Sequence, residues 1–259
     1  MPSNKKIIES FYTKEKREFN AKYLWWHYTF EKLAVTIAGY ILPYNISANL
    51  VSSISLIFGL LGCFMIAIDP ERLFFFGIIL VVIWQILDDV DGHIARSKEA
   101  TKLGKYLDDS GANIMYAFFY ASLGMAFLSL SDHGFIILNQ IFENPSSISS
   151  IFVMSGFLSS LFLSLQAILS FHHKLLMEPQ NIGERAEAVK INDHSFRNTF
   201  IRVYKYFVSN VLEFPGLLVP LVLFSYLIGY LSIFLLFLAL FNLMNLVIKY
   251  FSIIKHITD

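Results

Sequence analysis

Long apolar runs alternate along the chain with short segments that carry most of its charged residues. A helical run of about 20 apolar residues is long enough to cross the hydrocarbon core of a bilayer. The pattern therefore predicts an all-α polytopic membrane protein with six transmembrane helices. They are expected at 47–68, 72–96, 103–130, 151–171, 207–227 and 231–254. We divide the chain accordingly into an N-terminal interfacial segment, 1–45, and a six-helix membrane domain, 46–259.

The N-terminal segment has a different pattern. In 1–22, basic residues and apolar residues at helical spacing predict an amphipathic helix on an anionic membrane surface, with a frayed basic tail as the alternative. Trp25 and Trp26 belong to an aromatic cluster of the kind found at the headgroup level. The apolar stretch 33–42 is too short to cross a bilayer, so it is expected to be the end of an interfacial helix that breaks at Pro43.

Composition supports the membrane class and orients the chain. The 259 residues are 56% hydrophobic, their mean hydropathy is +0.57, and the formal net charge is zero. A zero net charge gives no overall attraction to nucleic acid, so no nucleic-acid partner is expected. Of the 20 Lys and Arg residues, all but Arg72 lie in segments that the positive-inside rule places in the cytosol, and these include both termini. Cys63 stands alone, which excludes a disulfide within the chain.

An acidic cluster interrupts the apolar pattern where the second span ends. Asp88 and Asp91 are three residues apart and therefore share one face of a helix, and Asp108 lies near the start of the next span. Ionisable groups at membrane depth are costly unless they are paired or bind metal. Carboxylate oxygens suit Mg²⁺ or Mn²⁺, so these three residues are candidate metal ligands.

The polar residues beside this cluster have simpler interpretations. Asp89 and Asp109 are turned by about 100° from the candidate ligands, and we expect each to face solvent, a lysine or a supporting partner. His93 is better explained as an interfacial histidine than as a ligand. Gly104 and Ala112 belong to a seam of small residues that is also typical of helix packing.

The spacing Asp-x2-Asp-Gly-x2-Ala-Arg-x7-Gly-x3-Asp resembles the signature of the CDP-alcohol phosphotransferase family, also called the CDP-alcohol phosphatidyltransferases. The matching residues are Asp88, Asp91, Gly92, Ala95, Arg96, Gly104 and Asp108. The family pattern ends with one more aspartate four residues later, and this chain has Ala112 there. Asn49 matches the asparagine of the Pro-Asn-x-x-Thr element that opens the first family helix.

The resemblance implies a reaction and assigns roles. A CDP-linked donor such as CDP-diacylglycerol passes its phosphatidyl-type group to a polar alcohol and releases CMP, as in phospholipid biosynthesis. Asp88, Asp91 and Asp108 would hold two Mg²⁺ or Mn²⁺ ions on the pyrophosphate. The nucleotide would be bound by Gly92, Ala95, Arg96, Gly104 and Asn49. The small residues among these allow close approach to the helix backbones, and the arginine is a phosphate or structural partner. The expected location is a bacterial or archaeal plasma membrane, or the endoplasmic reticulum in a eukaryote.

Ala112 leaves the catalytic base open. In the family, the aspartate at this position is taken to deprotonate the attacking alcohol. Here the base could be Asp109, His93 or a residue of 178–205, or the acceptor could arrive already ionised. A CDP-lipid binder without turnover and an altered residue at this position are further alternatives. We favour an active enzyme, because a binder would have little reason to keep three buried carboxylates that are costly without metal.

Two other functions fit parts of the pattern. The Trp-rich stretch Leu24-Trp25-Trp26 resembles the choline and ethanolamine phosphotransferase branch, in which a CDP-amino alcohol meets diacylglycerol. A membrane transporter or a structural membrane protein is the alternative from another class, although the chain lacks the matching halves expected of many transporters. The oligomeric state is open, with a homodimer as one option.

Overall fold

A computed structural model describes residues 23–97, 102–128, 145–177, 204, 207–208 and 213–258. The amphipathic helix predicted in 1–22 and nearly all of the polar loop predicted at 178–205 lie outside the described residues.

The described residues are mostly helical and contain no strand, which confirms the all-α class. Its elements are α3 (Leu24–Thr29), α4 (Glu31–Ile41), the 3₁₀ helix η1 (Leu42–Tyr44), α5 (Ala48–Ile68), α6 (Pro70–Ser97), α7 (Lys102–Ala126), α9 (Pro145–Met177), α11 (Leu218–Leu227) and α12 (Leu231–Thr258). As expected, α4 ends just before Pro43, which lies in η1.

Local signals set the ends of the first long helices. The Ser47 side chain accepts a hydrogen bond from the Leu50 backbone N–H at 3.2 Å and so caps the start of α5. Asp69 separates α5 from α6, and its Oδ1 accepts from the Arg72 N–H at 3.2 Å. Pro70 then occupies the first position of α6, where its missing N–H costs nothing. These caps make a tight antiparallel hairpin of the first two spans.

Four helices are long and apolar enough to cross a membrane: 48–68, 70–97, 150–171 and 231–254. The structure therefore does not confirm all six expected spans. The third corresponds to α7, which has 25 residues, but its first turns carry the acidic residues of the motif and lower its hydropathy. In the fifth, residues 207–208 are helical, residues 213–217 form a turn that contains Pro215, and α11, a helix of 10 residues, follows.

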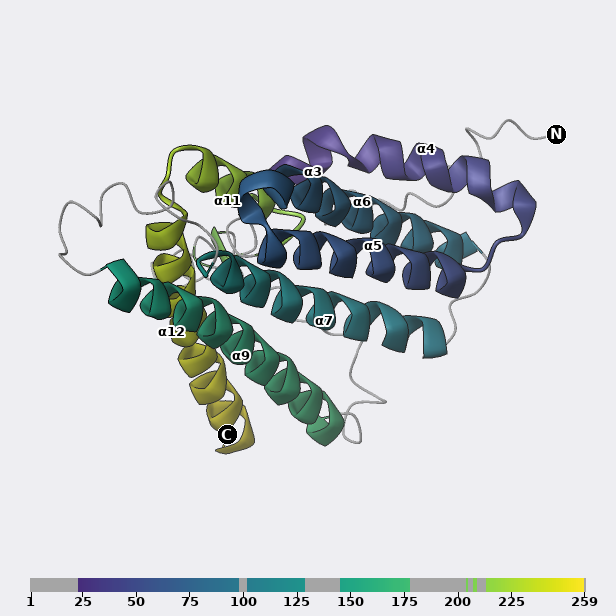
Figure 1. Ribbon diagram of the computed structural model, residues 1–259. Helices are drawn as coiled ribbons and strands as arrows, with labels where there is room; N and C mark the ends of the chain where they lie inside the picture. The colour runs from purple at the N-terminus through teal and green to yellow at the C-terminus, as the bar shows by residue number, and fades with distance from the viewer. Residues whose placement is uncertain are drawn as a thin grey trace.

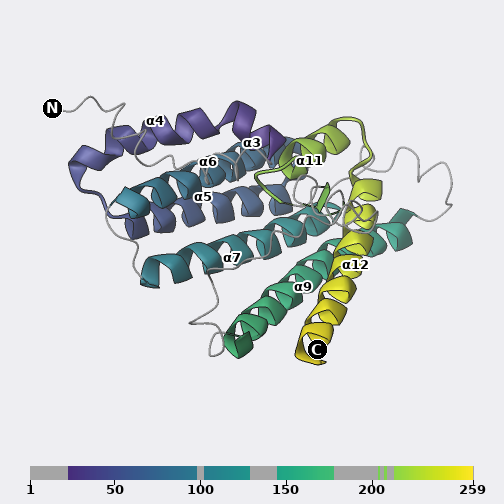
Figure 2. The same ribbon diagram turned by 180° about the vertical axis from the view of Figure 1, so that it is seen from behind.

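The long helices form two groups that meet along α7. In both views, α5, α6 and α7 run side by side, and α4 lies along the outer side of α6 (Figures 1 and 2). Helices α9 and α12 make a second pair that crosses the first group at an angle. The two groups share one core, whose largest fully buried side chains include Tyr120, Phe74, Phe119, Phe127, Phe152 and Phe214. The Phe214 ring contacts Trp84 of α6, with ring centroids 4.8 Å apart.

Two glycines set the contact between α7 and α9. A Cβ atom on Gly156 would lie 2.5 Å from the Cα of Gly124, and one on Gly124 would lie 2.8 Å from the backbone oxygen of Val153. Helices in membranes use small residues in this way, because close backbone approach replaces the hydrophobic driving force that lipid removes.

Gly156→Ala should therefore destabilise the protein by about 1–3 kcal/mol, because the new methyl group must push two backbones apart. Gly111→Ala in α7 is the matched control: its Cβ would meet nothing within 4 Å, so it should be neutral or stabilising by up to about 1 kcal/mol. The thermal midpoint for loss of the monodisperse protein in detergent measures both. Equal midpoints for the two variants would contradict this packing.

The charge distribution predicts the orientation of the bundle. Because 19 of the 20 basic residues belong to segments assigned to the cytosol, a reporter fused to either terminus should be read out in the cytosol. Accessibility of each reporter to a membrane-impermeant protease in intact and opened cells measures this. Protection of the two termini on opposite sides would mean an odd number of spans.

Candidate active site

The ends of α6 and α7 enclose a cavity of about 200 Å³ that collects much of the sequence motif. Asp88, Gly92 and Arg96 line it from α6, and Asp108 and Ala112 line it from α7. The other lining residues are Tyr23, Trp26, Trp84, Gln85, Asp89, Tyr116, Phe214 and Pro215. A neighbouring cavity of about 120 Å³ is also lined by both Asp88 and Asp108, together with serines of α5. The two helices thus bring together carboxylates that lie 20 positions apart in the sequence.

Asp91 lies on α6 but lines neither of these two cavities. Its side chain is buried, with 4% of its surface exposed, and its Oδ2 makes no hydrogen bond with the described residues. A buried carboxylate oxygen without a donor is costly unless a cation approaches it. Asp91, Asp88 and Asp108 therefore have the oxygen chemistry that Mg²⁺ or Mn²⁺ requires. Within the described residues, however, no three His, Cys, Asp or Glu side chains lie close enough together to hold a metal ion.

The residues assigned to the nucleotide divide into two sets. Gly92 lies at the cavity wall, and a Cβ atom there would lie 3.1 Å from Nη1 of Arg96. The absence of a side chain at Gly92 therefore leaves room for the guanidinium group. Ala95, Gly104 and Asn49 are half-buried and do not line either cavity of Asp88 and Asp108.

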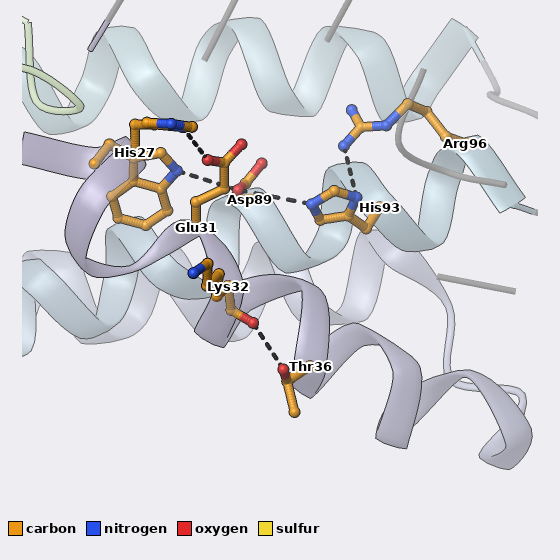
Figure 3. A network of polar contacts seen from close by, with 8 residues as sticks. His27, Glu31, Lys32, Thr36, Asp89, His93 and Arg96 are labelled. Atoms are coloured by element: carbon orange, nitrogen blue, oxygen red, sulfur yellow. Dashed lines mark hydrogen bonds and ion pairs between the residues drawn. The ribbon is translucent and has the colours of Figure 1, made fainter. Parts of the chain in front are cut away.

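Asp89 also lines the 200 Å³ cavity, but its carboxylate contacts a further set of groups. Its Oδ2 accepts a hydrogen bond from Nε1 of Trp26 at 3.2 Å and lies 3.7 Å from Nε2 of His93. Nδ1 of His93 is 3.2 Å from Nη2 of Arg96 (Figure 3). The side chain of Asp109 lies outside the described residues.

This network also shows what surrounds two residues that were expected at the membrane interface. His93 was expected at the interface and is only 2% exposed, and Trp26, expected at the headgroup level, is only 4% exposed. The reason in both cases is that α3 and α4 cover this part of α6. Figure 3 shows His93 beside Asp89 at this place. His93, one of the candidates for the missing base, thus contacts Asp89 and Arg96.

The same covering helices bury a second carboxyl group. Glu31 of α4 is 3% exposed, and its Oε2 lies 2.5 Å from Nδ1 of His27. Burial, with a smaller contribution from the negative charge of Asp89, raises the pKa of Glu31 to about 7, against an opposing effect of Lys32. This carboxyl group therefore holds its proton at pH values where an ordinary glutamate is charged.

A third cavity, of about 500 Å³, lies between α7, α9 and α12 and was not anticipated from the motif. Asp108, Ala112 and Tyr116 line it and also line the 200 Å³ cavity, so one wall is common to both. Its other polar lining residues are Asn113, Gln166, Ser170, Glu213, Asn242, Asn245 and Lys249. We call it the polar cavity.

Glu213 is the residue of the polar cavity that sequence reasoning missed. A signal was present, because Glu213 is the only charged residue in the predicted span 207–227, and an ionisable residue within a span is a functional candidate by default. Its Oε2 accepts a hydrogen bond from the Tyr23 hydroxyl at 2.7 Å. The next residue is held as well, since the Phe214 N–H donates to the Tyr116 hydroxyl at 3.0 Å.

Membrane-length helices that bring carboxylates to shared cavities define a polytopic membrane protein with a polar site between its helices. The family model of the CDP-alcohol phosphatidyltransferases matches residues 45–254, and the chain belongs to this family. The resemblance read from the motif is thereby confirmed. The family consists of transferases that generally depend on divalent metal ions. Neither the curated proteins nor the solved structures compared with the chain give a significant match.

The raised pKa of Glu31 predicts a pH-dependent stability. Between the ordinary value of 4.5 and about 7, the folded state binds more protons than the unfolded state, so stability falls as the pH rises through this window. Glu31→Gln removes the titrating group. Between pH 5 and pH 8, the free energy of unfolding of the variant should therefore rise by about 2 kcal/mol relative to that of the wild type.

Denaturant titration in detergent at several pH values measures this gain, with Glu71→Gln as the control because Glu71 is exposed at the far end of α6. A constant stability difference between Glu31→Gln and the wild type across the range would contradict the assignment.

Proposed function

We propose that the protein transfers a phosphatidyl-type group from a CDP-linked lipid, such as CDP-diacylglycerol, to a polar alcohol and releases CMP. The observation that carries the proposal is that Asp88 and Asp108, two carboxylates of the family motif, line the same cavities from neighbouring helices. Phospholipid biosynthesis is the process that such a reaction serves.

For this reaction, the protein must hold the donor and the acceptor in position and neutralise the negative charge of the pyrophosphate. Asp88, Asp91 and Asp108 would hold two Mg²⁺ or Mn²⁺ ions, which neutralise charge on the pyrophosphate and on the departing CMP. Gly92 leaves space beside the backbone of α6 for the guanidinium group of Arg96, which lines the same cavity and is placed to contact a phosphate of the nucleotide.

A lipid substrate is supported by the apolar surface beside the site. An apolar cavity of about 840 Å³ lies between α5, α7 and α9. Ile57 on α5 and Ala117 on α7 line it. They are the next residues in the sequence after Leu56, which lines the 120 Å³ cavity, and Tyr116, which lines the 200 Å³ cavity. Acyl chains entering from the bilayer would meet this surface while the headgroup reaches the carboxylates.

The choline and ethanolamine type of reaction has no particular support in the structure. Its sequence argument rested on the stretch containing Trp26, and this ring instead anchors α3 to α6 through Asp89. The polar cavity, in contrast, offers a water-soluble acceptor a place next to the carboxylates. Cytosolic orientation and a homodimeric state stay predictions.

The first test is binding. Asp91→Ala should abolish Mn²⁺-dependent binding of CDP to the detergent-solubilised protein, because the two remaining carboxylates are too few to hold two ions against their hydration. Asp89→Ala should weaken binding much less, since the Asp89 carboxylate is occupied by Trp26 and His93. Isothermal titration with CDP, with and without Mn²⁺, measures both. Equal losses in the two variants would show that the assignment of helix faces is wrong.

A further inference from the structure

If the protein has the proposed function, another group must act as the base in place of the aspartate that is missing at Ala112. Ala112 lines both the 200 Å³ cavity and the polar cavity, as do its neighbours Asp108 and Tyr116. A methyl side chain at this position fills little of the space between the two cavities. A group in the polar cavity therefore lies next to the space where the donor pyrophosphate would be bound.

The polar cavity is built for a ligand that forms hydrogen bonds. Asn242 lines it and is fully buried; its side chain interacts with the buried Tyr120 hydroxyl, but neither its Oδ1 nor its Nδ2 makes a hydrogen bond of normal geometry with the described residues. Incomplete hydrogen bonding of a buried amide is destabilising, so a ligand that completes these bonds is favoured. Gln166, Asn245 and Lys249 add further polar groups along the same wall. A compound with several hydroxyl groups can form hydrogen bonds with this lining, whereas an acyl chain cannot.

Glu213 contributes a carboxylate to the same cavity, and its position is fixed. Its Oε2 accepts from the Tyr23 hydroxyl, and the Phe214 N–H donates to Tyr116, which itself lines the cavity. The turn is also held by the bond from the Trp26 N–H to the Pro215 carbonyl oxygen at 3.2 Å. A base held in this way needs no reorganisation before the reaction.

We propose that the polar cavity binds a small, water-soluble, polyhydroxylated acceptor and that Glu213 is the catalytic base. The acceptor hydroxyl gives its proton to the Glu213 carboxylate, and its oxygen forms a new bond to the phosphorus that carries the lipid. The bond from this phosphorus to the bridging oxygen breaks, and the electron pair leaves with CMP. Ala112 provides the room in which the acceptor lies between the base and the donor.

The test uses the full-length protein in lipid nanodiscs with CDP-diacylglycerol and Mn²⁺. Glycerol and glycerol 3-phosphate serve as a neutral and an anionic polyol acceptor, and CMP release is measured. Glu213→Gln keeps an oxygen acceptor for Tyr23 but loses the basic oxygen. Its kcat should fall by about 10²- to 10⁴-fold, the usual contribution of a positioned base, while CDP binding and the KM for the acceptor stay within about threefold.

A second substitution separates a lost base from a damaged fold. In the wild-type background, Ala112→Asp should lower kcat, because the new side chain occupies acceptor space. In the Glu213→Gln background, the same substitution should instead raise kcat at least about tenfold, because it restores a carboxylate one turn after Asp108. Glu71→Gln, at an exposed position that lines none of the four cavities described, is the control and should leave kcat unchanged.

The possible failures are distinguishable. Loss of the proposed function would appear as a wild-type protein that does not bind CDP in the presence of Mn²⁺. CDP binding without CMP release in the presence of either acceptor would contradict the proposal that the polar cavity binds a polyhydroxylated acceptor. CMP release by Glu213→Gln within threefold of the wild type, or the same sign of the Ala112→Asp effect in both backgrounds, would overturn the assignment of Glu213 as the base.

Discussion

The cost of placing carboxylates within membrane-length helices governs this structure. A charged side chain in hydrocarbon is strongly disfavoured unless protein groups or bound ions surround it. Asp88 and Asp91 lie in a helix that is otherwise apolar enough to cross a bilayer. The elements around them respond to this constraint: α5 brings serines to the cavity wall, α7 brings a third carboxylate, and α3 and α4 cover the outer side of α6. The site therefore depends on the whole first group of helices.

The N-terminal helices form part of the site wall as well as its cover. Trp26 and Tyr23 both line the 200 Å³ cavity, and each also holds another part of the chain in place. Trp26 binds Asp89 through its ring and Pro215 through its backbone, and Tyr23 binds Glu213. One short segment thus fixes α6 and the turn before α11 relative to each other. The site is closed by contacts between segments that no local pattern connects.

Local features could be predicted from the sequence, and long-range ones could not. Ser47 and Pro70 act within the first turn of a helix, each apolar run lies within one helix, and Asp88 and Asp108 lie on consecutive helices. The class, the first two spans and the shared cavity follow from them. The bond of Trp26 to Asp89 joins residues 63 positions apart, which explains why an aromatic ring expected in the headgroup region is buried.

The fifth span shows the same limit for an element. Hydropathy alone predicted a helix over 207–227, but prolines at 215 and 220 act on the backbone. Pro215 lies in a turn, and Pro220 falls in the first turn of α11, where a missing N–H is tolerated. The turn places Glu213 at the polar cavity. The sequence signal for this residue was its charge within an apolar run, and its significance emerges only once α7 and α12 are seen on either side of it.

The bond between Tyr23 and Glu213 joins residues 190 positions apart, and this has a consequence for biosynthesis. Ribosomes deliver the N-terminal helices long before the segment that contains Glu213 leaves the membrane-insertion machinery. During that interval, Tyr23 and the backbone N–H of Trp26 must be satisfied by water or lipid headgroups rather than by their final partners. The outer wall of the site is consequently among the last parts of the molecule to be completed, although it is built from some of the first residues to be made.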